Sequence, residues 1–268
     1  MSDSHYRTRR FDIGTVISKT LSVVGRNLPL LSLLALILGA APNVWFTWAQ
    51  SHAITEIGGK KAFGDPSQIA MWGVAFLVVV FGSFLLQGAL ARVVASDLNG
   101  EKPDLGLALS AGFRAFAPLL LLGVVSGLAI LLATAALIVP GVILSLAWVV
   151  AWPALVFERK GVFEALSRSR DLTRGRRWPI FGLSLIYVVC ATVVQLLIVG
   201  IFGIVGVILG AAASNVGAAA IQIATLAASG LAVAVVTIFN MTGVTLLYHE
   251  LRDTREGIGA NATAEVFA

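Results

Sequence analysis

The sequence predicts an all-α polytopic membrane protein with about six transmembrane helices and three amphipathic interfacial helices. Of its 268 residues, 58% are hydrophobic and only 12% are charged, and the mean hydropathy is +0.92. An ordinary soluble domain is about half apolar and about a quarter charged. Because a soluble fold of this length still exposes much of its surface to water, it could not conceal so much apolar surface. Lipid is the natural solvent for the excess.

The apolar residues are gathered into six long stretches. A transmembrane helix needs about 20 mostly apolar residues, each adding about 1.5 Å of rise. The stretches that meet this requirement are Leu28–Trp48, Ile69–Ala95, Ala117–Val139, Pro140–Phe157, Pro179–Val207 and Val216–Tyr248. We therefore expect a polar N-terminal tail (1–10), a single transmembrane helical domain (11–250) and a cytoplasmic C-terminal tail (251–268).

The positive charges predict the orientation. Lysine and arginine total 19, and only Lys60 and Lys61 fall between the first and second spans. The others lie in the N-terminal segment, in or beside the second–third and fourth–fifth loops, and in the C-terminal tail. Since cytoplasmic loops carry the excess of lysine and arginine, both termini are predicted to be cytoplasmic.

Aromatic residues near the span ends agree with this orientation. Tryptophan and tyrosine are enriched at headgroup depth, where the ring is half in lipid and half in water. Trp45, Trp48 and Trp72 are expected at the outer interface, and Trp152, Trp178 and Tyr248 at the inner one.

A unit of amphipathic helix, proline and apolar span occurs three times. The copies begin at Asp12, Asp104 and Gly161, and their prolines are Pro29, Pro118 and Pro179. Proline is favoured in the first turn of a helix and pushes the residue before it out of helical conformation. Each proline is therefore predicted to mark the corner between a helix lying on the membrane and one crossing it. For the first surface helix, Phe11–Arg26, two placements stay open: the headgroup plane or packing against the bundle.

The spans offer little chemistry. We find no Asp, Glu, Lys, Arg or His near a predicted midplane, no His/Asp/Glu cluster at metal-ligand spacing, and neither GxGxxG nor GxxxxGK[ST]. Cys190 is the one cysteine, which excludes an intramolecular disulfide. We therefore expect no catalytic residues, no metal, no cofactor and no enzymatic activity. The basic segments lack interleaved aromatics, so no nucleic-acid partner is expected.

Two sets of residues are candidates for contacts. The basic segment between the fourth and fifth spans is a candidate for anionic-lipid contact, although positive-inside topology alone would also explain it. Its candidate residues are Arg168, Arg170, Arg174, Arg176 and Arg177. Gln195 and Asn240 are polar residues inside spans. They are candidates for interhelical hydrogen bonds or, alternatively, for a polar pathway.

Two runs carry a family resemblance. ALVFERKGVFEALSRSRDLTRGRRWPIFGLSLI, followed later by TLLYHELRDTREG, resembles the membrane domain attached to some bacterial glycerophosphodiester phosphodiesterases. It is also similar to the YciC-like family of small inner-membrane proteins. The specific motifs lie in Phe157–Ile186 and Thr245–Gly257. The resemblance implies a location in the bacterial inner membrane. Phosphodiesterase activity is not expected, because only Leu251–Ala268 follows the last span, far short of the roughly 250 residues of a catalytic barrel.

Two functional hypotheses follow. The first is a non-enzymatic component that organises or regulates an envelope process through its cytoplasmic helices and basic surface. The alternative is a transporter or channel for a small solute or lipid, since internal repeats are common in transporters. Membrane lipids are the expected partners in either case, together with other membrane proteins or a second copy of the chain.

Overall fold

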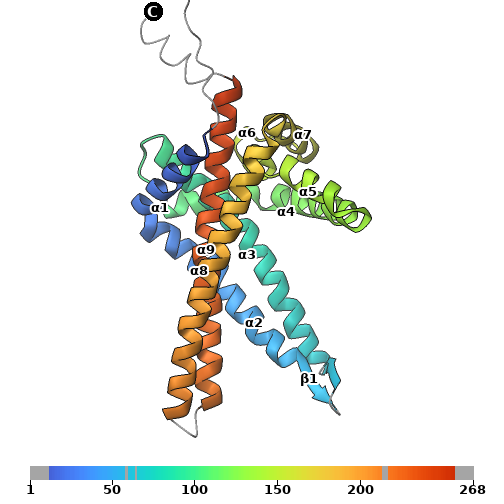
Figure 1. The fold of residues 1–268 in the computed structure, drawn as a ribbon, viewed down its shortest axis with the longest axis vertical. Coiled ribbons are helices and arrows are strands. Elements are labelled where there is room, and N and C mark those ends of the chain that lie inside the picture. Colours follow the sequence, from blue (N-terminus) through green and yellow to red (C-terminus); the bar gives the residue numbers. More distant parts are fainter. Residues whose placement is uncertain (1–11, 58–59, 64, 213–216, 257–268) are drawn as a thin grey trace, which may run out of the picture. The chain divides into compact units, whose positions relative to one another are not determined.

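The computed structural model describes residues 12–57, 60–63, 65–212 and 217–256 (Figure 1). Within them, six helical segments are long and apolar enough to cross a membrane, which confirms the all-α polytopic fold. The segments are Ile13–Ser51, Pro66–Leu98, Leu105–Ala136, Ile138–Glu158, Arg177–Ala211 and Ala219–Glu256. The chain is a multi-pass membrane protein. The predicted N-terminal tail and most of the predicted C-terminal tail lie outside the described residues.

The elements follow one another as helices, with one short hairpin. They are α1 (Ile13–Ala35), the π-helix η1 (Leu36–Ala40), α2 (Ala41–Ala53), β1 (Ile54–Ile57), β2 (Lys60–Phe63), α3 (Pro66–Leu98), α4 (Leu105–Ala136), α5 (Ile138–Ala147), α6 (Ala151–Glu158), α7 (Val162–Thr173), α8 (Arg177–Ala212) and α9 (Gly217–Glu256). The antiparallel hairpin pairs Ile54 with Phe63 and Ile57 with Lys60, and it was not predicted. Helix α9 continues past the predicted domain boundary at residue 250.

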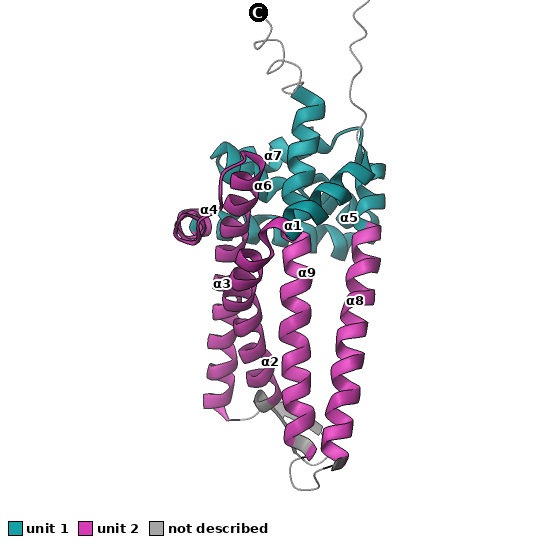
Figure 2. Ribbon diagram, turned by 90° about the vertical axis from the view of Figure 1, so that its left-hand side faces the viewer, with its two compact units in different colours: residues 1–25, 117–184, 242–268 teal, residues 26–116, 185–241 magenta. Residues whose placement is uncertain are grey.

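The chain forms two compact units (Figure 2). Unit 1 comprises residues 1–25, 117–184 and 242–268, and unit 2 comprises residues 26–116 and 185–241. Each unit combines segments that are distant in the sequence, so neither is a contiguous domain. The predicted single domain over 11–250 stays a prediction.

A helix break lies near two of the three repeat prolines, whereas the orientation of the flanking helices to the membrane stays a prediction. In α1 the helix is interrupted at Asn27 (φ −111°, ψ 15°), two residues before Pro29. Pro179 lies in the first turn of α8, after a link in which Gly175 has φ +81°. The corner predicted at Pro118 is wrong, because α4 runs through this proline without such an interruption. Phe116, just before it, packs on Phe81 within unit 2, with ring centroids 4.6 Å apart.

The copies begin with comparable caps. The Asp12 carboxylate accepts hydrogen bonds from Gly14 N (3.0 Å) and the Thr15 hydroxyl (2.9 Å), and the Thr15 bond lowers the pKa of Asp12. Asp104 accepts from Leu107 N at 2.8 Å. In the third copy, Glu164 accepts from Gly161 N at 3.4 Å. A side-chain acceptor thus binds an otherwise unpaired backbone donor at each helix start.

In unit 2, a glycine lets two elements approach closely. Pro42 has no N–H to bond the Leu38 carbonyl four residues earlier, and the chain is π-helical just there. That carbonyl oxygen lies well inside van der Waals distance of where a Cβ at Gly82 would be, so only glycine fits α3 at this point. At the other end of α3, Asp97 accepts from Arg26 Nη2 (2.6 Å) and from Asn27 Nδ2 (2.7 Å).

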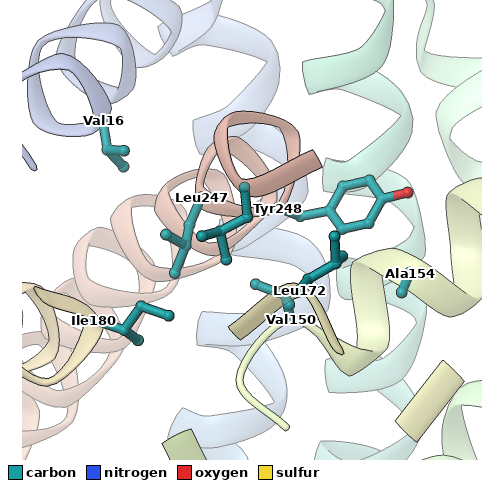
Figure 3. Close-up of a cluster of buried hydrophobic side chains, with 8 residues drawn as sticks. Val16, Val150, Ala154, Leu172, Ile180, Leu247 and Tyr248 are labelled. Atoms are coloured by element: carbon teal, nitrogen blue, oxygen red, sulfur yellow. The ribbon is translucent and has the colours of Figure 1, made fainter. Parts of the chain in front are cut away.

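In unit 1, a hydrophobic core joins α1, α6, α7, α8 and α9 (Figure 3). Its buried side chains are Val16, Val150, Ala154, Leu172, Ile180, Leu247, Tyr248 and Leu251. The first surface helix therefore packs against protein through Val16. On the same helix, Ile17 and Leu21 remain exposed.

We predict that Gly82→Ala lowers the stability of the protein by about 1–3 kcal/mol, because the new methyl group would force α3 away from Leu38. The measurement is the unfolding midpoint of the purified protein in detergent. Gly73→Ala, also in α3, is the matched control: no atom lies within 4 Å of its Cβ position, so stability should be unchanged or slightly higher. Equal effects of the two substitutions would contradict the close approach.

Candidate functional site

The most highly connected polar group in unit 1 is the carboxylate of Glu158, the last residue of α6. It accepts hydrogen bonds from Arg168 Nε (2.7 Å) and the Tyr248 hydroxyl (2.8 Å) on one oxygen. Its other oxygen lies 2.6 Å from Lys160 Nζ. One carboxylate thus links α6, α7 and α9.

The network continues to the end of α9. Arg168 Nη2 also bonds Glu256, which in turn accepts from Arg252 Nε at 3.1 Å. We call these six residues, Glu158, Lys160, Arg168, Tyr248, Arg252 and Glu256, the Glu158 cluster. Its three cations alternate with its two carboxylates, so the charges are largely compensated within the cluster.

Local structure positions the two partners on α7. Arg159, directly after Glu158, has a left-handed backbone conformation (φ 51°), and α6 ends there. Helix α7 then starts after Gly161 and turns Arg168 toward Glu158. The Ala147 carbonyl, at the end of α5, accepts from the Ser169 hydroxyl (2.9 Å) and the Thr173 hydroxyl (3.3 Å). A carbonyl left unpaired by the end of α5 is thus satisfied by α7, which fixes the face that α7 buries.

Tyr248 was predicted at the inner membrane interface; the structure buries it within unit 1, and its depth in the membrane stays a prediction. Its side chain is 0% exposed and stacks on Phe157, with ring centroids 5.6 Å apart and planes within 10°. The hydroxyl is buried too, but it is satisfied by Glu158. Sequence analysis missed Glu158 and Tyr248 as site residues; their place in the two resemblance motifs was the one signal that could have indicated them.

A second group of polar contacts ties α1 and the link between α7 and α8 to α9. Lys19 Nζ lies 2.9 Å from Glu250, whose carboxylate is only 5% exposed. Arg176 donates to the Thr254 hydroxyl, and Arg255 donates to the Arg174 carbonyl oxygen at 2.7 Å. The end of α9 is therefore bonded within unit 1 both to α1 and to the link between α7 and α8.

The five predicted lipid-contact arginines divide into two classes. Arg168 is engaged by two carboxylates and Arg176 by Thr254. Arg177 is half-buried, and its Nε atom is buried without a hydrogen bond among the described residues. Arg170 and Arg174 are exposed and point away from the core. Of the five, these two have their guanidinium groups most available to a ligand.

The chemistry of the cluster favours structure over proton transfer. Partial burial alone would lower the pKa of Arg168, but its hydrogen bonds to Glu256 and Glu158 outweigh this and raise that pKa above its usual value. The guanidinium therefore stays charged and holds its carboxylates by fixed hydrogen bonds. Among the described residues, no group of three or more His, Cys, Asp or Glu side chains could hold a metal ion.

The two intramembrane candidates lie apart in unit 2. The Tyr187 hydroxyl of α8 donates to the Val236 carbonyl oxygen of α9 at 2.9 Å, and Asn240 is its second polar neighbour. Gln195 lies eight residues further along α8, roughly 12 Å along the helix axis. Its side chain is exposed. The structure therefore does not bring Gln195 and Asn240 together into one polar site.

Comparison with known proteins gives a family. Residues 76–251 match a family described as Domain of unknown function (DUF7847). The chain belongs to this family. No curated protein and no solved structure matches the chain. The matched segment contains Glu158 and its three donors, Lys160, Arg168 and Tyr248, whereas Arg252 and Glu256 lie beyond it.

We predict that Glu158→Gln destabilises the protein by about 2 kcal/mol or more, because Arg168 and Lys160 would lose their shared, largely buried anion. Thermal unfolding of the purified protein in detergent measures this. Glu101→Gln is the control, since it breaks a pair with Arg92 (3.6 Å) that is exposed and should cost less than about 1 kcal/mol. A Glu158→Gln protein as stable as the control would show that the cluster contributes little.

Proposed function

We propose that this chain is a non-enzymatic protein of the bacterial inner membrane, with both termini cytoplasmic, that binds anionic lipid headgroups through α7. In this role it would organise or regulate an envelope process at the membrane surface. The proposal goes further than the family description, which assigns no activity. The resemblance to phosphodiesterase-attached membrane domains and YciC-like proteins supports the location and stays a prediction.

The observation that carries the proposal is the division of α7 into two faces. Its apolar residues face the core of unit 1, including Val162, Ala165, Leu166 and Leu172. The opposite stripe, at helical spacing, consists of Phe163, Ser167, Arg170 and Arg174, all exposed. Glu164 and Asp171 flank this stripe on one side and are exposed as well. The buried face is held by the Glu158 cluster, so the cationic stripe is presented on a fixed support.

Two exposed aromatic rings in the same part of the sequence also support a lipid ligand. Phe163 is 75% exposed and Trp178, at the start of α8, is 83% exposed with its ring edge-on to Phe181. Such rings are favourable at headgroup depth, where they contact both lipid and water. Each arginine near an anionic membrane surface contributes about 1 kcal/mol. A pair of exposed arginines on the same stripe as exposed Phe163 therefore fits a lipid phosphate better than a soluble partner.

A transport function has weaker support. It would require polar side chains that converge on a pathway, and Gln195 and Asn240 do not converge. The nearest polar group, the Tyr187 hydroxyl of α8, already donates a hydrogen bond to the Val236 carbonyl oxygen of α9 and has Asn240 as a second polar neighbour. In this proposal, the polar residues of the spans form hydrogen bonds between helices instead of lining a pathway.

We predict that anionic lipid stabilises the full chain through Arg170 and Arg174. The double variant Arg170→Gln/Arg174→Gln should bind phosphatidylglycerol about 10- to 30-fold more weakly, measured as the lipid concentration that raises the thermal midpoint in neutral detergent. Arg114→Gln, an exposed arginine of α4, is the control and should retain wild-type binding. Binding unchanged in the double variant would overturn the lipid role, and saturable solute flux abolished by Asn240→Ala would favour transport.

Cysteine labelling in intact cells tests the predicted orientation. In a Cys190→Ser background, Asp65→Cys, at the start of α3, should react with a membrane-impermeant maleimide. Lys102→Cys, between α3 and α4, should react only after the cells are permeabilised. The two sites flank the same helix, so each is the control for the other. The reverse pattern of labelling would place both termini outside.

A further inference from the structure

Two half-buried arginines of unit 1 have no carboxylate partner among the described residues. Of the five arginines that are half-buried, Arg92, Arg168 and Arg252 each lie close to a glutamate oxygen, at 3.6, 2.7 and 3.1 Å. The other two, Arg176 and Arg177, form no ion pair in the part of the chain that the structure describes. Because a half-buried charge is costly without a counter-charge, an anion would bind favourably at this point.

A second arginine, instead of a carboxylate, lies beside Arg176. Arg176 donates to the Thr254 hydroxyl, and Arg255, the next residue of α9, donates to the Arg174 carbonyl oxygen at 2.7 Å. These two bonds cross between the α7–α8 link and α9 and hold the side chains of Arg176 and Arg255 beside each other. Burial lowers the pKa of Arg176, and the charge of Arg255 lowers it further. Both acceptors are neutral oxygens, so neither positive charge is compensated by them. We call Arg176 and Arg255 the arginine pair.

The carboxylates of this region do not neutralise the arginine pair. Glu250 is the carboxylate whose charge acts on Arg176, and it already lies 2.9 Å from Lys19 Nζ. Asp171 and Asp253 are exposed, and neither forms an ion pair among the described residues. The α7–α8 link and the end of α9 therefore share an excess of positive charge.

The free donors of the arginine pair suit a phosphate group. A guanidinium has five N–H donors, and each arginine of the pair uses one of them within the described residues. A carboxylate offers two oxygens, which one guanidinium fork already occupies. A terminal phosphate offers three acceptor oxygens and a charge of about −1.5 to −2 at pH 7, so it can accept from two guanidinium groups at once.

We propose that Arg176 and Arg255 form a binding site for a terminal phosphate group, carried by a membrane lipid such as phosphatidic acid or by a soluble phosphate monoester. The site lies within unit 1 and is distinct from the exposed stripe of α7, because Arg174 contributes only its carbonyl oxygen to it. It does not depend on lipid binding by Arg170. A phosphate between the two guanidinium groups replaces their repulsion with charge-assisted hydrogen bonds and ties the α7–α8 link to α9.

The test is the thermal midpoint of the full chain in neutral detergent, with glycerol 3-phosphate titrated against sodium chloride at equal ionic strength. The phosphate should stabilise the wild type, and Arg176→Gln/Arg255→Gln should weaken its apparent affinity about 10- to 100-fold, since hydrogen bonds to charged groups are lost. Lys102→Gln/Arg114→Gln removes the same charge from exposed positions and should respond as the wild type does. Equal losses in the two double variants would overturn the proposal.

A second arm of the experiment identifies the source of the phosphate. Phosphatidic acid in neutral micelles should act at lower concentration than glycerol 3-phosphate if a lipid carries the group, and at higher concentration if the ligand is soluble. Stabilisation by neither probe would overturn the site. Phosphatidylglycerol, a diester, should depend on Arg170 and Arg174 instead, so failure of the proposed function and failure of this site are distinguishable. Equal dependence of both lipids on the arginine pair would overturn the assignment to a terminal phosphate.

Unfolding without phosphate separates a ligand site from a purely structural contact. In phosphate-free buffer, Arg176→Gln/Arg255→Gln should be at least as stable as the wild type, because the repulsion between two adjacent cations is removed. A wild type clearly more stable than this variant without phosphate would show that the arginine pair serves the fold by itself, and would contradict the proposal.

Discussion

The bilayer interior offers no hydrogen-bonding partner, and this constraint shapes every part of the chain. Each backbone amide within hydrocarbon must be satisfied by its own segment, so the spans are helical apart from the break at Asn27 in α1 and the turn at residues 148–150 between α5 and α6. Charged side chains are costly at that depth and concentrate at the ends of helices. Where the end of α6, helix α7 and the end of α9 meet in unit 1, the charges pair with one another, and the Glu158 cluster is the result.

Within that cluster, fold and candidate function depend on the same contacts. Glu158 and Arg168 hold α7 by one face, and the Ala147 carbonyl fixes its rotation through Ser169 and Thr173. The opposite face is therefore fixed as well, and it carries Arg170 and Arg174. Partly buried ion pairs often add little net stability, because desolvation opposes the Coulombic gain. Their larger effect here is geometric, since they determine which arginines remain available to a ligand.

The three repeat prolines show that local sequence alone does not decide where a helix breaks. Pro29, Pro118 and Pro179 occupy equivalent places in the repeat, yet a helix break lies near the first and third only. Before Pro118, the contact of Phe116 with Phe81 and the close approach of Gly88 to Gly112 hold the first part of α4, up to residue 116, along α3 within unit 2. A proline permits a helix start without requiring one, so packing decides between the two outcomes.

The sequence by itself determined the membrane class, the six spans and the preference of cations for one side, because each depends on the composition of a continuous stretch. Tertiary structure alone decided which polar groups have partners. It buried Tyr248 against Phe157, gave Arg168 two carboxylates, one of them at Glu256, and kept Gln195 apart from Asn240. Such pairings join residues that are distant in the chain, and no local pattern encodes a distance in space.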